Sequence, residues 1–311
     1  MLVVVALGGN AILRRGEPMS VANQRESIAT ACTPLAQIAQ HHDLVVSHGN
    51  GPQVGLLALQ AASYDQVSEY PFDVLGAQTE GMLGYLIEQE LGNQLGNDRP
   101  IATLVTRTVV DAHDPAFDNP TKFVGPIYSP GEADVVAAAR GWQMKRDGDS
   151  MRRVVPSPTP LRILESKPIQ WILDNSGVVL GAGGGGVQTT HDSEADIVAG
   201  VEAVIDKDLA SAVLARDLGA EMLVIATDVD GVYTDWGGPD QRLVARAHPD
   251  ALDPQDFPAG SMGPKVRAAA QFAREAHGTS IIGSLTDIDK MFAGTAGTVI
   301  TTDATGIEYR P

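Results

Sequence analysis

Residues 2–10 of the chain read LVVVALGGN, and residues 44–53 read LVVSHGNGPQ. Each stretch starts as a short apolar run, which is typical of a buried strand, and then turns into glycine and asparagine. In parallel sheets, ligands bind beyond the carboxyl ends of the strands, and glycine lets the backbone approach an anion closely there. A helix that follows such a loop adds backbone N–H donors. The two stretches therefore predict a parallel sheet with a phosphoryl-binding edge.

Similar apolar runs recur along the chain, with helical stretches between them. The predicted strands are residues 2–7, 44–47, 101–105, 177–180, 221–226, 280–283 and 297–300. The predicted helices are residues 20–40, 74–95, 191–200, 207–218 and 264–277. This alternation predicts an α/β fold with a mostly parallel sheet and helices on both faces. Right-handed crossovers would place the loops after Leu7, Ser47, Leu180 and Ala226 along one edge.

Residues 113–163 interrupt this alternation, and we refer to them below as the lid. The segment holds seven prolines and a charged pair, Arg152 and Arg153. Its short apolar pieces, around Val124 and Val154, predict a small hairpin subdomain rather than another strand–helix–strand unit. We expect the lid to cover the ligand-binding edge. A passive insertion is the alternative.

The composition excludes several classes of protein. With 311 residues and a net charge of −17, the chain is expected to repel nucleic acid and anionic membranes. No apolar run approaches the roughly 20 residues that a membrane span needs. Cys32 is the only cysteine, which excludes an intramolecular disulfide and a cysteine metal cluster. The first residues show no pattern of a secretory signal, so we expect a cytoplasmic protein.

A third glycine-rich loop, residues 181–186, reads GAGGGG and follows the predicted strand at residues 177–180. A tight turn explains one or two glycines, whereas a run of them indicates that the backbone approaches a ligand. We refer to residues 181–186 as the glycine run. Its sequence is not a Walker A motif, and no G-x-x-x-x-G-K-[ST] occurs anywhere in the chain. The P-loop NTPase mechanism is therefore excluded.

Two lysines stand where helices are predicted to begin. Lys207 lies between Asp206 and Asp208, and Lys265 follows Pro264. The aspartates could simply cap the helix, but capping does not call for a lysine. A cation near a helix N-terminus is unfavourable unless an anion is close to it. Both lysines therefore indicate a phosphate, the group that lysine neutralises in phosphoryl transfer.

Residues 226–233 read ATDVDGVY and follow another predicted strand. The spacing of Asp228 and Asp230 is similar to that of a calcium loop, but the loop is too short and lacks the later glutamate. A polar turn that ends in Tyr233 is better suited to a nucleoside, with the ring against the base. His48 lies beside a glycine loop, and we expect it to hydrogen-bond locally rather than to act as a base.

Taken in order, the motifs resemble those of the carbamate kinases, a branch of the amino acid kinase family. The resemblance spans nearly the full length and rests on residues 7–11, 47–55, 119–122, 152–158, 183–186, 204–208, 227–233 and 260–265. It implies a three-layer αβα sandwich with a mostly parallel central sheet and a small protruding lid subdomain. It also implies a homodimer and the reversible reaction of ATP with carbamate to give ADP and carbamoyl phosphate. Magnesium would accompany the nucleotide, with no metal site of the protein's own.

The resemblance also implies a role for each matching residue. Lys207 and Lys265 would neutralise charge on the phosphates, with Asp208 between them as organiser. Lys122 of the lid would reach over the site as a mobile cation. The residues implied to bind carbamate and the moving phosphoryl group are Gly8, Gly9, Asn10, Gly49, Asn50 and Gly51. Those implied to bind the nucleotide are Gly183, Gly184, Asp228, Tyr233, Met262 and Lys265. The acceptor side would comprise residues 1–112 and 164–200, and the nucleotide side residues 201–311, within one domain.

Two other functions stay open at this point. The chain could be another amino acid kinase that acts on an acylglutamate, on glutamate or on UMP. A larger acceptor would need an arginine set on the N-terminal loops, which the sequence lacks. It could also be a nucleotide-binding regulator without catalysis, although such a protein needs fewer cations than Lys122, Lys207 and Lys265 provide. Within the carbamate kinase branch, the expected role is ATP synthesis in the catabolism of arginine or a related nitrogen compound.

Overall fold

The computed structural model describes residues 1–14, 16–63, 69–96, 99–258 and 260–310. The strands are β1 Leu2–Leu7, β2 Asp43–His48, β3 Ile101–Thr103, β4 Arg107–Val110, β5 Lys122–Tyr128, β6 Met144–Asp147, β7 Ser150–Val155, β8 Pro160–Ile163, β9 Val178–Leu180, β10 Val187–Asp192, β11 Ile197–Gly200, β12 Met222–Thr227, β13 Tyr233–Thr234, β14 Arg242–Ala247, β15 Thr279–Ser284, β16 Thr298–Ile300 and β17 Ile307–Tyr309. The α-helices are α1 Gly9–Ile12, α2 Val21–His41, α3 Gly51–Ser63, α4 Phe72–Leu95, α5 Pro130–Arg140, α6 Ser166–Leu173, α7 Lys207–Asp217, α8 Met262–Ala276 and α9 Ile288–Phe292.

The central sheet is mostly parallel, as the sequence predicts. Its strands are ordered β13-β14-β16-β15-β12-β1-β2-β9-β3, and β17 pairs with β14. The six strands from β15 to β3 are parallel to one another, whereas β16 runs antiparallel to β15. The loops after β1, β2, β9 and β12 therefore leave the sheet at one edge, and this edge carries the glycine-rich stretches.

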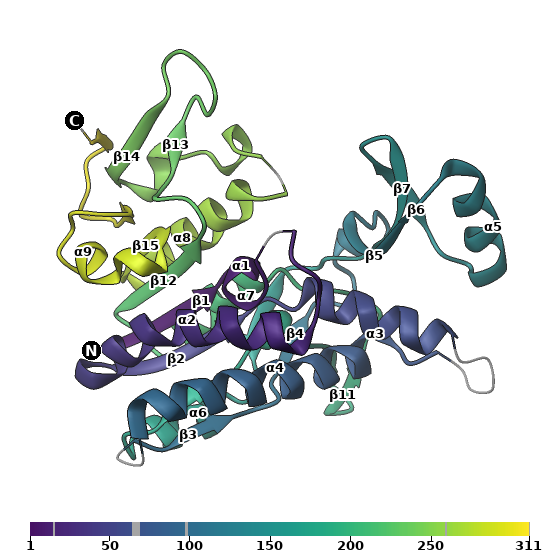
Figure 1. Cartoon of the computed structure of the whole chain (residues 1–311), viewed down its shortest axis with the longest axis horizontal. Coiled ribbons are helices and arrows are strands. Elements are labelled where there is room, and N and C mark those ends of the chain that lie inside the picture. Colours follow the sequence, from purple (N-terminus) through teal and green to yellow (C-terminus); the bar gives the residue numbers. More distant parts are fainter. Residues whose placement is uncertain (15, 64–68, 97–98, 259, 311) are drawn as a thin grey trace.

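The side chains of β1 alternate between two cores, one on each face of the sheet. Val3 and Val5 pack with α2 and α4, whereas Val4 packs with α7 and α8. This alternation follows from the period of two in a strand, and an apolar residue at every position is required when both faces are covered. The arrangement is a three-layer αβα sandwich, which confirms the predicted fold class (Figure 1).

The lid stands away from the sandwich, beside the end formed by β13 and β14 (Figure 1). It contains the three-stranded sheet β5-β7-β6 and helix α5. The predicted hairpin pieces pair directly, with Val124 opposite Arg153. Helix α5 begins with a capping box between Ser129 and Glu132. The last part of the lid returns to the body, because β8 pairs with β4 in the second sheet, β11-β10-β4-β8.

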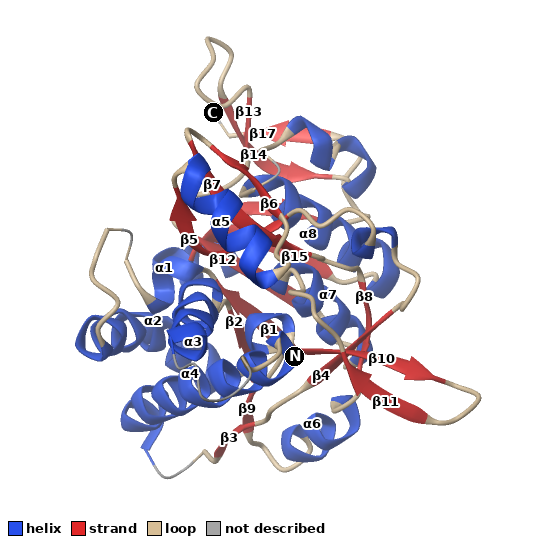
Figure 2. Cartoon of the chain, turned by 90° about the vertical axis from the view of Figure 1, so that its right-hand side faces the viewer, coloured by secondary structure: helices blue, strands red, loops and turns tan. Residues whose placement is uncertain are grey.

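The helix predicted for residues 191–200 is wrong. The segment instead completes an antiparallel ribbon of β10 and β11, with His191 opposite Val198, and this ribbon projects from the body (Figure 2). The carboxylate of Asp192 accepts hydrogen bonds from the backbone of Glu194 and Ala195, and Asp196 adopts a left-handed conformation. These local bonds compete with a helix and favour a turn.

Helices α3 and α6 were not predicted from the sequence, nor was the second sheet. Helix α3 begins at Gly51, directly after the second glycine stretch, so backbone N–H groups do follow this loop. The short helix α1 begins in the same way at Gly9. Across the described ranges, no helix is long and apolar enough to cross a membrane.

Candidate active site

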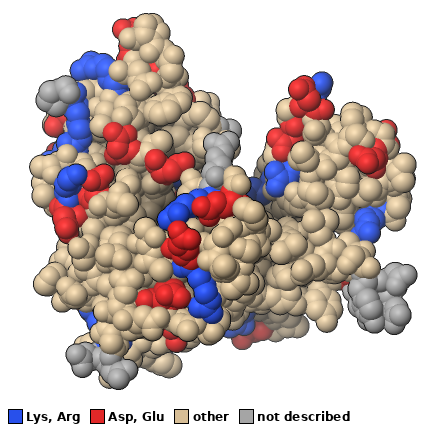
Figure 3. Space-filling model, viewed as in Figure 1, with Lys and Arg blue, Asp and Glu red and all other residues tan. Residues whose placement is uncertain are grey.

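The glycine loops after β1 and β2 lie close to their neighbours at Gly8 and Gly49, where a side chain would be crowded. A Cβ on Gly8 would lie 2.9 Å from the carbonyl oxygen of Ala226, at the end of β12. A Cβ on Gly49 would lie 3.3 Å from Cδ of Lys207. The loop after β2, residues 49–51, is therefore in contact with the start of α7, and we refer to it as the acceptor loop. Figure 3 shows this face of the molecule hollowed between the lid and the β13–β14 end.

Two lysines share one buried carboxylate beside the acceptor loop. Nζ of Lys207 lies 2.6 Å from Oδ1 of Asp208, and Nζ of Lys265 lies 2.8 Å from Oδ2. Lys207 is the first residue of α7, and Lys265 lies in the first turn of α8. These three residues form the lysine cluster, and the structure brings together the two lysines that the sequence places 58 positions apart.

The charges of the lysine cluster hold one another in place. Burial raises the pKa of Asp208, but the two ammonium groups outweigh this effect and lower the pKa to about 2. Burial also lowers the pKa of Lys207, and the carboxylate of Asp208 opposes that shift. The unfavourable position of each lysine at a helix N-terminus is thus relieved by a carboxylate of the protein itself. A phosphate that enters the site would meet cations already assembled.

The lid contributes a third lysine next to this cluster. Nζ of Lys122, the first residue of β5, lies 3.1 Å from Oδ2 of Asp206. The other oxygen of Asp206 caps α7 by accepting from the backbone N–H groups of Asp208 and Leu209. The capping role that the sequence suggests for Asp206 is therefore present. The same residue also fixes the cation of the lid at the start of α7.

Both asparagines of the N-terminal glycine loops are held through their amide nitrogens. Nδ2 of Asn10 donates to Oδ2 of Asp228 at 2.9 Å. Nδ2 of Asn50 donates to Oγ1 of Thr79, on α4, at 2.8 Å. Asp228 was assigned from the sequence to the nucleotide side. Its contact with Asn10 places it where the loops after β1 and β12 meet.

The glycine run packs against the acceptor loop. A Cβ on Gly183 would lie 2.4 Å from Nε2 of His48, and one on Gly184 would lie 2.0 Å from Nδ2 of Asn50. Gly184 also has a φ of 66°, which L side chains rarely adopt. The dense glycines are thus explained by the close approach of the side chains of His48 and Asn50, as well as by backbone conformation.

His48 makes the local contact expected for it, because Nδ1 lies 3.1 Å from the carbonyl oxygen of Gly49. Burial lowers its pKa to about 4. The ring is therefore neutral at pH 7. A neutral, buried imidazole that bonds its own loop is suited to support the loop rather than to accept a proton from a substrate.

Tyr233 begins β13, and its hydroxyl donates to the carboxylate of Asp230. Its ring makes an edge contact with Trp236, with the ring centroids 5.1 Å apart. Met262, the first residue of α8, packs against the core beneath. Sequence reasoning missed Trp236, although a tryptophan three positions after Tyr233 in a polar loop is a usable signal for an exposed aromatic pair.

A buried carboxyl group that the sequence does not indicate, Glu80 of α4, lies below the glycine run. It accepts hydrogen bonds from the backbone and hydroxyl of Thr106 and from the backbone N–H of Gly183. Burial raises its pKa to about 8, against the effect of these three donors. Glu80 thus anchors the glycine run from below. No local pattern marks it, because its partners lie 26 and 103 positions away.

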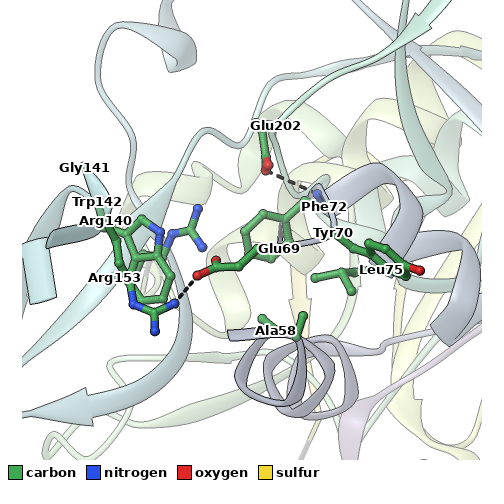
Figure 4. A pocket seen from close by; sticks show the side chains of 11 residues that line it. Ala58, Glu69, Tyr70, Phe72, Leu75, Arg140, Gly141, Trp142, Arg153 and Glu202 are labelled. Carbon is green, nitrogen blue, oxygen red and sulfur yellow. Dashed lines mark hydrogen bonds and ion pairs between the residues drawn. The ribbon is translucent and has the colours of Figure 1, made fainter. Parts of the chain in front are cut away.

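A cavity of about 270 Å³ lies at the base of the lid, away from these groups. The guanidinium of Arg153 lies between the rings of Trp142 and Phe72, at 4.2 and 4.8 Å from their centroids. At its rim Arg140 pairs with Glu69 (Figure 4). Among the described residues that line it, none was predicted for the site. It marks the junction between lid and body.

Comparison with known proteins adds the following findings. The model of the amino acid kinase family matches residues 1–284. The carbamate kinase of Haemophilus influenzae is 52% identical over 99% of this chain and 99% of that protein. The carbamate kinase of Rhizobium meliloti is 51% identical over 99% of this chain and 96% of that protein. A solved structure, carbamate kinase from Giardia lamblia bound to AMP-PNP, has a TM-score of 0.89 at 38% identity, over 96% of this chain and 98% of that chain.

Proposed function

The chain belongs to the amino acid kinase family, and from this premise we propose that it transfers a phosphoryl group reversibly between ATP and carbamate, giving ADP and carbamoyl phosphate. It is a phosphotransferase that is about half identical to curated carbamate kinases over nearly its whole length. The observation that carries the proposal is the lysine cluster, which presents two cations on one buried carboxylate beside the acceptor loop.

In this proposal the lysines stabilise the charge of the moving phosphoryl group. Lys207 and Lys265 would bind its oxygens from the body, while Asp208 keeps the two ammonium groups at fixed positions. Lys122 would exchange its contact with Asp206 for one with the phosphoryl group. Preorganised charges of this kind act most strongly in a site from which water is excluded.

The acceptor needs no general base in this reaction. The carboxylate of carbamate is already ionised and nucleophilic at neutral pH, so catalysis consists of positioning and electrostatic stabilisation. The neutral, buried state of His48 is in keeping with this. We assign the binding of carbamate and of the moving phosphoryl group to the glycine loops after β1 and β2, with Asn10 and Asn50 as their polar side chains. Gly8, Gly9, Gly49 and Gly51 would supply backbone.

We assign the nucleotide to the half formed by residues 201–311, with the acceptor half formed by residues 1–112 and 164–200. The nucleotide would contact Asp228, Tyr233, Met262 and Lys265 of the first half, and Gly183 and Gly184 at the border with the acceptor half. Magnesium would bind mainly through the phosphate oxygens, since this ion keeps several waters and needs only one or two protein carboxylates. During the reaction, the ion would offset the negative charge of the phosphate oxygens.

We also propose that the protein works as a homodimer in the cytoplasm, where it makes ATP during the catabolism of arginine or a related nitrogen compound. A dimer is supported by large apolar side chains that are exposed on two neighbouring helices, Leu56 and Leu59 on α3 and Val74, Met82 and Tyr85 on α4. Burial of such side chains against a second copy would be favourable. The molar mass of the native protein, measured by light scattering, tests this part.

The reaction is tested with purified protein, magnesium, ADP and carbamoyl phosphate, with ATP detected by a coupled enzyme. We expect ATP to form. If no ATP forms, the proposed function is wrong. Formation of ADP from ATP with acetylglutamate, glutamate or UMP, but not with carbamate, would favour another amino acid kinase. Binding of ATP without any turnover would favour a regulator.

A further inference from the structure

Thr79 and the acceptor loop meet at a buried hydrogen bond, and the proposal drawn from it rests on the proposed function. We propose that Thr79 is a positioning residue that fixes the amide of Asn50 in one orientation, so that Oδ1 of Asn50 accepts a hydrogen bond from the amino group of carbamate. Thr79 would thereby help the enzyme to select an acceptor that carries an amino group.

The hydroxyl of Thr79 has its proton committed. Thr79 lies in α4 and is fully buried. Its Oγ1 donates to the carbonyl oxygen of Gly76, one turn earlier, at 2.8 Å. A hydroxyl has one proton and two lone pairs. Toward the neighbouring Asn50, Oγ1 of Thr79 can therefore act only as a hydrogen-bond acceptor.

An acceptor at this position decides which way the amide of Asn50 points. Nδ2 can donate to Oγ1 of Thr79, as it does at 2.8 Å, whereas Oδ1 in its place would face a lone pair. The side chain is buried, with 7% of its surface exposed, so a lost hydrogen bond here is not replaced freely by water. Among the described residues, no group donates to Oδ1, which leaves this atom for a ligand.

The glycine run closes the other side of the amide. A Cβ on Gly184 would overlap Asn50, so only glycine fits against it. The preceding glycine, Gly183, donates its backbone N–H to Glu80, the residue next to Thr79. Two consecutive residues of α4 thus hold the amide, one directly and one through the glycine run. A rotation of the amide would have to break the bond to Thr79 and displace a backbone that Glu80 anchors.

The orientation matters for the choice of acceptor. Carbamate presents an amino group where acetate has a methyl group, and otherwise the two are similar in shape and charge. Oδ1 of Asn50 can accept from the amino group but gains nothing from the methyl group. If the amide rotates, a donor faces the amino group, which also donates. Loss of the fixed orientation should therefore lower kcat/KM for carbamoyl phosphate more than kcat/KM for acetyl phosphate.

The test compares carbamoyl phosphate with acetyl phosphate as phosphoryl donors to ADP, in the wild-type protein and in Thr79→Val, which removes the hydroxyl but keeps the shape. We expect Thr79→Val to lower kcat/KM for carbamoyl phosphate about tenfold, the effect of one hydrogen bond, and to change kcat/KM for acetyl phosphate less than twofold. The KM for ADP should stay unchanged. Thr79→Ser keeps the hydroxyl and should restore most of the preference.

Ser280→Ala is the matched control, because it also removes a buried hydroxyl, one that bonds the carbonyl oxygen of Ala269 in another part of the fold. It should cost stability without changing the preference between the two donors. If Thr79→Val does not fold, Thr79→Ala removes the same hydroxyl and replaces it in the comparison.

The proposal is overturned if Thr79→Val lowers kcat/KM equally for both phosphoryl donors, or if it changes the KM for ADP instead. It is overturned as well if Thr79→Ser behaves like Thr79→Val. It is also overturned if the wild-type protein shows no preference for carbamoyl phosphate. These results differ from failure of the proposed function, in which the wild-type protein makes no ATP at all.

Discussion

The lysine cluster and the acceptor loop meet at one edge of the sheet, where the acceptor loop packs against the stem of Lys207, but they are held in different ways. In the lysine cluster a single ionised carboxylate, Asp208, orders two cations. At the acceptor loop a neutral hydroxyl orders a neutral amide. In our proposal the first region stabilises charge on the phosphoryl group, and the second sets the orientation of the acceptor. Variants in the two regions should therefore fail in different ways.

The largest effect is expected for Lys207→Ala. This change removes a preorganised cation from the phosphoryl group, and we expect kcat to fall by about two orders of magnitude or more. Lys290→Ala removes an exposed lysine that pairs with Asp287 and should leave kcat unchanged. The steady-state rate of ATP formation measures both. A Lys207 variant with wild-type kcat would remove this residue from the site.

Asp208→Asn should affect stability as well as rate. Two buried ammonium groups would lose their common partner, and breaking a buried pair costs about 3 kcal/mol. Asp43→Asn, which removes an exposed partner of Arg99, should cost far less. Urea unfolding at pH 7 compares the two. Equal, small losses of stability in the two variants would show that the buried ion pairs do not hold the lysine cluster together.

The same carboxylate should give the wild-type protein an acid-dependent loss of stability. Its pKa in the folded protein is about 2, below the 3.8 of a free carboxyl group. The ion pairs therefore contribute stability that is fully present above pH 3.8 and is lost as the pH falls toward 2. The difference in unfolding midpoint between wild type and Asp208→Asn should shrink over this range. A constant difference would contradict the ion pairs as the cause.

A smaller effect is expected at the base of the lid. Arg153→Ala removes a guanidinium that lies between a ring of the lid and a ring of the body. Such a contact is worth about 1 kcal/mol, so the lid should be held less firmly and kcat should fall a few-fold. Arg146→Ala, at an exposed position of the lid, is the control. Equal rates in the two variants would show that this junction does not hold Lys122 in place.

The smallest effect is expected at Cys32, which belongs to neither region. The thiol is buried in the core, and burial raises its pKa to about 12. Thiolate is the reactive form, so a thiol reagent should neither label the native protein nor slow it. Labelling should occur only after unfolding in urea. Rapid loss of activity in the native state would contradict the position of Cys32 in the core.

The sequence predicts the two regions unequally. The fold class, the mostly parallel sheet and the glycine loops at one edge follow from local patterns, because strand periodicity and glycine act over a few residues. The structure also brings together Lys207, Asp208 and Lys265, which motif resemblance places in one site. By contrast, the contacts of Thr79 and Glu80 join α4 to loops that are 26 to 103 positions away. Such partners leave no local pattern.

The wrong helix at residues 191–200 has a local cause instead. Its composition allows a helix, but these residues pair with one another as the ribbon of β10 and β11, around the turn that Asp192 stabilises. Hydrogen bonds from the backbone to this side chain thus favour a turn over the helix. The contact between Lys122 and Asp206 also leaves no local pattern, because one residue lies on the lid and the other on the body, although the motif resemblance places Lys122 at the same site.

The most direct test of the difference between the two regions is the ratio of kcat/KM for carbamoyl phosphate to that for acetyl phosphate, measured side by side in Lys207→Ala and Thr79→Val. We predict that Lys207→Ala lowers both values by the same large factor and leaves the ratio unchanged, whereas Thr79→Val lowers the ratio about tenfold. A changed ratio in Lys207→Ala, or an unchanged ratio in Thr79→Val, would contradict this prediction.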